Sequence, residues 1–121
     1  MDNANKNVIV INNDPQILKG LILLLEDMSL NVLSSTNQKI LEQINTACPD
    51  LLILPLQFDN GESCIDLINN LRVHFDKNIP AILISTNNNF NNNPENNPSL
   101  TLLSDQVKPH VLRQQVKALL A

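Results

Sequence analysis

The chain has 121 residues, 43% of them hydrophobic and 17% charged, and this length and apolar content suit one domain with one core. The formal net charge is −4, the eight lysines and arginines are scattered, and only three residues are aromatic. The composition therefore argues against two domains and against nucleic-acid binding, because it offers neither a basic surface for phosphates nor aromatic platforms for bases.

The first seven residues form a polar leader, and residues 8–121 are interpreted as a single domain. The leader lacks the basic start and the apolar stretch of a signal peptide, and no apolar run is long enough to span a membrane. We therefore expect a cytoplasmic protein without membrane contact. Cys48 and Cys64 lack the spacing of metal ligands and are expected to be free thiols.

Short apolar runs alternate with amphipathic segments along the chain. The runs are typical of strands buried on both faces of a parallel sheet, and the segments show the three- and four-residue spacing of helices. In chain order, we predict a strand at Val8–Ile11, a helix from Pro15 to Met28 capped by Asp14, a strand at Leu30–Leu33, a helix across Ile40–Ala47, a strand at Leu51–Leu54, a helix at Ser63–Phe75, strands at Ile79–Ile84 and Leu100–Leu103, and a helix from Pro109 to Leu120.

Asparagine is unusually frequent, with twenty residues in the chain and eight of them within 87–97. Asparagine competes with helical hydrogen bonding and the two prolines of this stretch remove donors, so residues 86–98 are predicted to form a loop. The alternation elsewhere predicts an α/β fold: a flavodoxin-like, doubly wound, five-stranded parallel sheet in the order 2-1-3-4-5. Any functional site is then expected at the carboxyl ends of strands one, three and four.

Four segments carry a resemblance to a known family. They are Val8-Ile-Val-Ile-Asn-Asn-Asp-Pro15, Pro49-Asp-Leu-Leu-Ile-Leu54, Ile79-Pro-Ala-Ile-Leu-Ile-Ser85 and Val107-Lys-Pro109. In order and spacing they resemble the receiver domains of two-component response regulators, over about Asn7 to Leu120. The stretch Asp59-Asn-Gly-Glu-Ser63 and a closing segment, the pattern Leu-Leu-x-x-x-Val-Lys-Pro-x-x-Leu-Arg at residues 102–113, are most similar to the receiver at the C-terminal end of hybrid sensor histidine kinases. By this resemblance, the Asn-rich loop replaces most of the fourth helix, which is lost or shortened.

The resemblance places the family's phosphoacceptor aspartate at Pro55, which has no carboxylate to attack phosphorus. It places the acidic pair that holds Mg²⁺ at Asn12 and Asn13. Amide side chains lack the charge that Mg²⁺ sites usually supply through carboxylates. We therefore expect no phosphorylation, no catalytic residue and no metal or other cofactor in this domain.

The family's lysine, which pairs with phosphoryl oxygens, falls on Asp105, and the proline after it falls on Gln106. The charge is thus reversed where a phosphate dianion would bind, and a trans peptide is expected before Gln106 because the cis form is costly without proline. Ser85 matches the family's hydroxyl residue at the end of strand four. By this resemblance, we expect the degenerate phosphorylation pocket to consist of Asn12, Asn13, Pro55, Ser85 and Asp105.

These residues predict a pseudo-receiver, meaning a receiver fold that cannot be phosphorylated and that acts through protein–protein contacts in two-component or phosphorelay signalling. The domain itself is not expected to be an enzyme, although the parent chain, if a hybrid, would be a histidine kinase. Its expected partners are a histidine kinase core or another signalling protein. A homodimer through the first and last helices, with Leu23, Leu25 or Leu120 at its centre, is a further candidate.

Three alternatives remain. In the first, the domain still accepts phosphate at a non-standard aspartate, either Asp59 or Asp14, although the first fits a solvated turn and the second an N-cap. In the second, the polar pocket binds a cation or a small amine. In the third, the Asn-rich loop binds a partner or self-associates.

Overall fold

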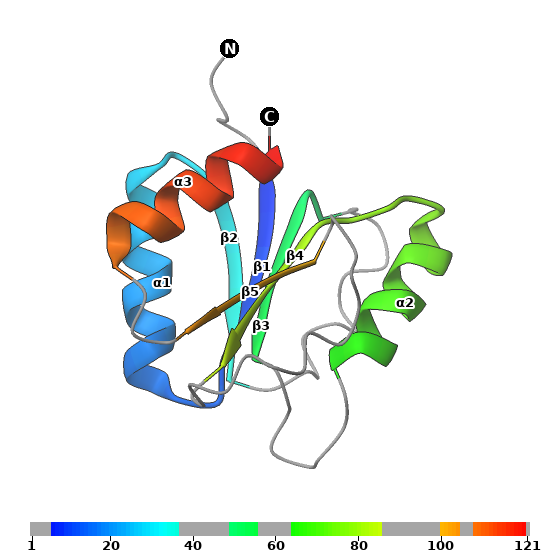
Figure 1. Ribbon diagram of the computed structural model, residues 1–121, viewed down its shortest axis with the longest axis horizontal. Helices are drawn as coiled ribbons and strands as arrows, with labels where there is room; N and C mark the ends of the chain where they lie inside the picture. Colours follow the sequence, from blue (N-terminus) through cyan, green and yellow to red (C-terminus); the bar gives the residue numbers. More distant parts are fainter. Residues whose placement is uncertain (1–5, 37–48, 56–63, 86–99, 105–107, 121) are drawn as a thin grey trace.

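The computed structural model describes residues 6–36, 49–55, 64–85, 100–104 and 108–120. They form a five-stranded, fully parallel sheet in the order β2-β1-β3-β4-β5 (Figure 1). The elements are β1 (Asn7–Ile11), α1 (Pro15–Asp27), β2 (Asn31–Ser35), β3 (Leu51–Pro55), α2 (Cys64–Phe75), β4 (Ala81–Ser85), β5 (Leu100–Ser104) and α3 (Pro109–Leu120). The predicted flavodoxin-like fold and strand order are confirmed.

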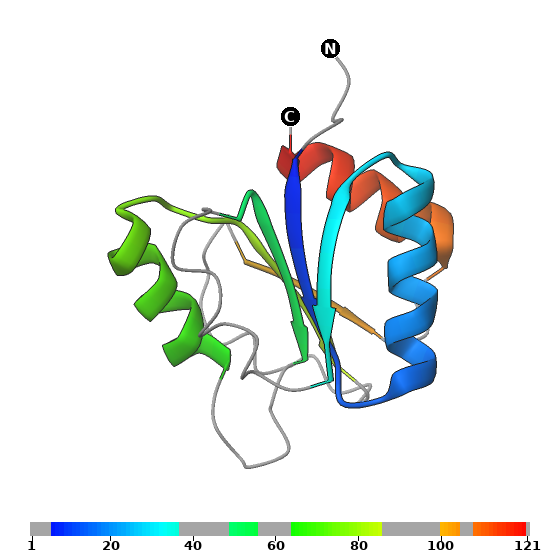
Figure 2. The same cartoon turned by 180° about the vertical axis from the view of Figure 1, so that it is seen from behind.

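Helices cover both faces of the sheet. In the two opposite views, α1 and α3 lie side by side on one face and α2 lies on the other (Figures 1 and 2). Each face has its own core, because alternate residues of a strand point to opposite sides. Val8 and Val10 of β1 join the cluster under α1 and α3, whereas Ile9 and Ile11 join the cluster under α2.

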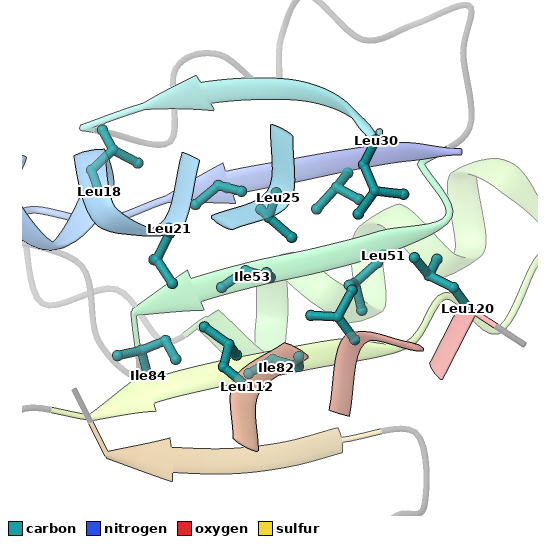
Figure 3. Packing of buried hydrophobic residues seen from close by; sticks show 13 residues of the cluster. Leu18, Leu21, Leu25, Leu30, Leu51, Ile53, Ile82, Ile84, Leu112 and Leu120 are labelled. Carbon is teal, nitrogen blue, oxygen red and sulfur yellow. The ribbon is translucent and has the colours of Figure 1, made fainter. Parts of the chain in front are cut away.

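The larger core lies between the sheet and the pair α1 and α3. Leu21 and Leu25 of α1 and Leu112 of α3 point down onto Ile53 and the neighbouring strands (Figure 3). Burying a Leu or Ile side chain contributes about 1.5–3 kcal/mol, so this aliphatic layer holds the fold together with little aromatic content. The central strand β3 is buried at all five positions, as its unbroken apolar run predicts.

Helix α1 begins and ends where local side chains satisfy its free backbone groups. The Asp14 side chain accepts a hydrogen bond from the Gln16 N–H at 2.9 Å, and Pro15 takes the first helical position. At the other end, Ser29 adopts a left-handed conformation with φ 64°, and the Leu30 N–H donates to the Leu25 carbonyl. Leu30 therefore closes the helix, and β2 runs from Asn31 to Ser35 rather than over the predicted Leu30–Leu33.

Other predicted elements match within one or two residues at each end, which is the usual uncertainty of helix and strand boundaries. The exposed leucine patch was wrong in two of its three residues: Leu25 and Leu120 are buried in the core, and Leu23 alone of the three is exposed. The predicted helix across Ile40–Ala47 and the Asn-rich loop at 86–98 lie outside the described residues. In the part of the chain that the structure describes, no helix is long and apolar enough to cross a membrane.

Candidate functional site

All five strands run parallel, so their carboxyl ends lie at the same edge of the sheet. The chain leaves β1 toward the face that carries α1, whereas the connection after β3 leads to α2 on the opposite face. When successive crossovers go to opposite faces in this way, flavodoxin-like folds bind their ligands at the carboxyl ends of the two strands, here β1 and β3. Asn12 and Asn13 follow β1 here, Pro55 ends β3 and Ser85 ends β4. The topology therefore brings together four of the five predicted pocket residues.

Asn12 is held in place by the turn between β1 and α1. Among the residues whose side-chain exposure the structure describes, it is the one buried polar residue, with 5% of its surface exposed. Its backbone N–H donates to the Ser35 carbonyl at 3.2 Å, and its side-chain Oδ1 accepts from the Asp14 N–H at 2.9 Å. The Asn12 amide therefore organises the turn through hydrogen bonds, without the charge that would attract a cation.

Asn13 lies half-buried beside Asn12, and the next residue, Asp14, is exposed. Asp14 is engaged as the cap of α1 through the Gln16 N–H, so the structure supports a capping role for the aspartate that was also considered as an alternative phosphoacceptor. Nowhere in the described segments do three His, Cys, Asp or Glu side chains gather into a group able to hold a metal ion.

Pro55 is buried at the end of the central strand. It lies opposite Ile84 in the β3–β4 register, whereas the β1–β3 register ends two residues earlier, at Val10 and Ile53. The Leu52 N–H donates to the Pro80 carbonyl on the β4 side. Because backbone N–H groups alternate sides along a strand, position 55 faces β1, and there proline has no N–H to donate. The β1–β3 pairing thus ends where proline removes the donor.

The remaining pocket residues are only partly described. Ser85 pairs with Ser104 of β5 through the backbone, which puts the end of β4 next to the end of β5. Asp105 follows Ser104 directly in the chain but, like Gln106 and Asp59, lies outside the described residues. The charge reversal at position 105 and the trans peptide before Gln106 therefore stay predictions.

The opposite edge of the sheet carries a polar cluster that the sequence analysis missed. The Asp50 carboxylate accepts from the Asn7 N–H at 2.8 Å and lies 3.6 Å from the Lys77 ammonium, while the Asp50 N–H donates to the Asn7 carbonyl at 2.7 Å. These contacts join the starts of β1 and β3 to the turn before β4. The position of Asp50 just before an apolar strand was the only signal in the sequence, and it does not reveal the partners.

A cavity of about 270 Å³ lies near this cluster, against the first residues of β1 and β2. The residues that line it include Ile9, Leu33 and Pro49, together with Asn7 and Asn31. Its lining contains none of the predicted pocket residues. The cavity is therefore separate from the carboxyl edge where the resemblance places the phosphorylation chemistry.

The sequence matches no family model and no curated protein. Solved structures do match. A two-component response regulator from Clostridium difficile aligns with a TM-score of 0.78 at 18% identity, covering 96% of both chains. The PhyR response regulator REC domain of Erythrobacter litoralis aligns at 0.78 and 20% identity, covering 97% of this chain and 91% of its own. A chemotaxis response regulator of Vibrio cholerae aligns at 0.78 and 13% identity, covering 96% and 99%. The chain thus has the flavodoxin-like fold of response regulator receiver domains.

Proposed function

We propose that this domain is a phosphorylation-incompetent pseudo-receiver, which acts as a protein-interaction or regulatory module in two-component or phosphorelay signalling. The observation that carries the proposal is Pro55, a buried imino acid at the strand end where receivers of this fold carry their phosphoacceptor aspartate. Proline has neither a nucleophilic oxygen nor a backbone donor at this position.

The amides at the end of β1 support the proposal. Asn12 is buried and already accepts the Asp14 N–H, and neither Asn12 nor Asn13 contributes negative charge. Because Mg²⁺ sites of this kind depend on carboxylates, the domain should bind Mg²⁺ very poorly. Phosphoryl transfer relies on the metal to neutralise developing charge, so nucleophile and metal site are lost together. The domain is then not an enzyme, and its role is in binding.

The proposed setting is cytoplasmic, and the proposed partners are a histidine kinase core or another signalling protein. The resemblance of residues 59–63 and of the closing segment to receivers of hybrid sensor histidine kinases supports placing the domain in such a kinase. There it would modulate the kinase core or compete with a phosphorylatable receiver for a phosphotransfer partner.

Two measurements test the proposal. The first is an amide NMR titration with Mg²⁺ and then with beryllofluoride, a phosphoryl mimic, followed at Asn12, Leu54, Ser85 and Asp105. Resonances that do not move are the expected result. Saturable shifts at these positions would show that the pocket still binds metal and phosphoryl groups, and would overturn the proposal.

The second measurement distinguishes the proposal from the alternative in which a non-standard aspartate accepts phosphate. The chain is incubated with Mg²⁺ and a small-molecule phosphodonor, and its intact mass is recorded. We expect no phosphate. A phosphorylated species that disappears in the variant Asp59→Asn, or in Asp14→Asn, would assign the acceptor and refute incompetence.

A further inference from the structure

The outer side of β2 carries open backbone hydrogen-bonding groups. β2 lies at one edge of the sheet, as Figure 3 shows, and pairs with β1 on its inner side. The Asn31 N–H and the Ser35 carbonyl both bond to β1. Because backbone groups alternate sides along a strand, the N–H and C=O groups of Val32 and Ser34 point away from the sheet. No group of the described segments bonds to them.

The sequence of β2 does not protect this edge. Native proteins usually shield an edge strand with charges, prolines or a bulge, because an open edge pairs readily with another strand. Residues 28–38 contain neither a charged residue nor a proline, and the β1–β2 register runs from Asn31 to Ser35 without a bulge. The other edge strand, β5, lies between Pro98 and Asp105 in the sequence. The open groups of β2 therefore select one kind of partner, which is another strand.

Leu33 gives the same edge an exposed apolar side chain. It keeps 42% of its surface exposed, although most large hydrophobic residues of the described segments are buried or half-buried. In the β1–β2 register Leu33 lies beside Ile9, which belongs to the core under α2. Both residues also line the cavity at the start of these strands. The apolar layer on this face of the sheet thus extends to the open edge.

The edge of β2 is complementary to a second copy of itself. When two β2 strands pair antiparallel about a two-fold axis at Leu33, each Val32 lies opposite Ser34 of the other copy, and their outward N–H and C=O groups bond to one another. Leu33 then lies opposite its own counterpart, at a pair without mutual backbone bonds, where side chains come closest. Identical residues meet at such an axis, so the absence of charge in this strand is a requirement for the pairing.

We propose that two copies of this chain pair through the outer edges of their β2 strands, so that their two sheets join into one. Opposite side chains of an antiparallel pair lie on the same face of the sheet. The apolar row that runs from Ile9 to Leu33 would therefore continue across the axis into the second copy. The proposal goes beyond the proposed function and does not involve the predicted phosphorylation pocket.

The test measures the mass of the full chain in solution. Sedimentation equilibrium at several protein concentrations should show a reversible species of twice the 13.5 kDa of one chain. Leu33→Lys should raise the dissociation constant about a hundredfold or more, because it replaces an apolar pair by two like charges at the axis. Leu23→Lys is the matched control, since it places the same charge at an exposed leucine of α1, and it should leave the dimer intact.

Two further variants test the geometry of the pairing. Ser34→Pro removes an N–H that faces away from β1, a position where an edge strand tolerates proline, so it should abolish the dimer and keep the fold. A mixture of Leu33→Lys with Leu33→Glu should form dimers although neither variant does so alone. The reason is that an axis at residue 33 places the lysine of one copy opposite the glutamate of the other. Circular dichroism and thermal unfolding check that each variant is folded.

Several outcomes would overturn the proposal. One is a parent chain that stays monomeric at millimolar concentration. Another is a dimer that persists in folded Leu33→Lys, because it would use a different surface, such as that of α1 if Leu23→Lys breaks it. A mixture with Leu33→Glu that restores no dimer would contradict the two-fold axis, and masses that rise beyond two copies would mean open-ended strand addition. None of these results affects the Mg²⁺ and beryllofluoride titration, which tests phosphorylation incompetence by itself.

Discussion

Pro55 lies opposite Ile84 across the β3–β4 register, and its nitrogen faces the end of β1 without a proton to donate. Supplying the missing carboxylate at this position does not supply the rest of the chemistry. The neighbouring strand end carries Asn12 and Asn13, whose amides bring no charge to bind Mg²⁺. In the proposed pseudo-receiver, the missing nucleophile is therefore one part of a combined loss at the carboxyl edge of the sheet.

The first prediction is that Pro55→Asp alone stays unphosphorylated. A lone carboxylate there, beside the uncharged Asn12 and Asn13, is expected to hold Mg²⁺ too weakly to neutralise the charge of an incoming phosphoryl group, and close negative charges repel each other. Intact mass after incubation with a small-molecule phosphodonor and Mg²⁺ measures the outcome, with Pro55→Asn as the control that lacks a nucleophile. Phosphate on Pro55→Asp but not on Pro55→Asn would show that the metal site still works, contrary to our account of the two asparagines.

The second prediction concerns the buried amide at the end of β1. Asn12→Asp keeps the acceptor for the Asp14 N–H but buries a negative charge without a described cation beside it. Burial raises the pKa of the introduced carboxyl, so the variant should lose about 1–3 kcal/mol of stability at neutral pH and recover part of it under acid conditions. Denaturant unfolding at several pH values measures the loss.

Mg²⁺ provides the second arm of this experiment. An introduced carboxylate can ligate Mg²⁺, so the Asn12→Asp variant should be stabilised by millimolar Mg²⁺, whereas the parent chain should not respond. Asn70→Asp, which places the same charge on exposed α2, is the matched control and should show neither the loss nor the rescue. A parent chain stabilised by Mg²⁺ would contradict the proposed loss of metal binding.

Much of the fold follows from local patterns in the sequence. The apolar runs of β1, β3 and β4 are strands in the core, as predicted. They could be recognised because a strand of a parallel sheet is buried on both faces and is therefore apolar throughout. The pair Asp14 and Pro15 located the start of α1 because one caps the helix and the other fits its first position. The strand order then followed from the alternation of strands and helices.

The errors arose where three-dimensional contacts decide. The sequence analysis begins the second strand at Leu30, but in the structure Leu30 closes α1 after Ser29. Ser29 adopts a left-handed conformation that is not evident from a serine in the sequence. Leu25 and Leu120 were assigned to a surface patch, yet both point into the core between α1, α3 and the sheet. The spacing of leucines along a helix shows which of them share a face. It does not show how two neighbouring helices pack, and that packing decides which of these leucines are buried.

The candidate site was predictable in position but not in detail. The order of the strands and the resemblance brought Asn12, Pro55 and Ser85 to one edge. The side-chain oxygen of Asn12 accepts a hydrogen bond from the Asp14 N–H. This contact depends on the backbone geometry of the turn, which could not be predicted from the sequence. The Asp50 cluster was missed for the same reason, because its partners Asn7 and Lys77 come from distant parts of the chain.

The third prediction tests that cluster. Asp50→Ala removes the acceptor of the Asn7 N–H and leaves Lys77 without its described ion-pair partner, so it should lower the free energy of unfolding by about 2 kcal/mol. Lys77→Ala should cost less than 1 kcal/mol, since the ammonium is half-exposed and such pairs contribute little. Denaturant unfolding of both variants checks the order. Equal losses would place the main contribution in the ion pair instead.

The fourth prediction concerns the left-handed residues that end α1 and α2. Ser29 has φ 64° and Asp76 has φ 51°. In each case the N–H groups of that residue and the next one donate back to carbonyls of the preceding helix, so the conformation is part of the helix end. A left-handed residue other than glycine costs about 1–2 kcal/mol, offset in part by the extra freedom of glycine in the unfolded chain.

Ser29→Gly should therefore stabilise the domain by about 0.5–1 kcal/mol, and Asp76→Gly should stabilise it less, because aspartate tolerates this conformation better than serine. Thermal and denaturant unfolding measure both. Ser29→Ala is the control, since alanine removes the hydroxyl group but keeps the Cβ atom, and it should bring no gain. If alanine stabilised the domain as much as glycine, the hydroxyl group rather than the backbone conformation would be the source of the strain.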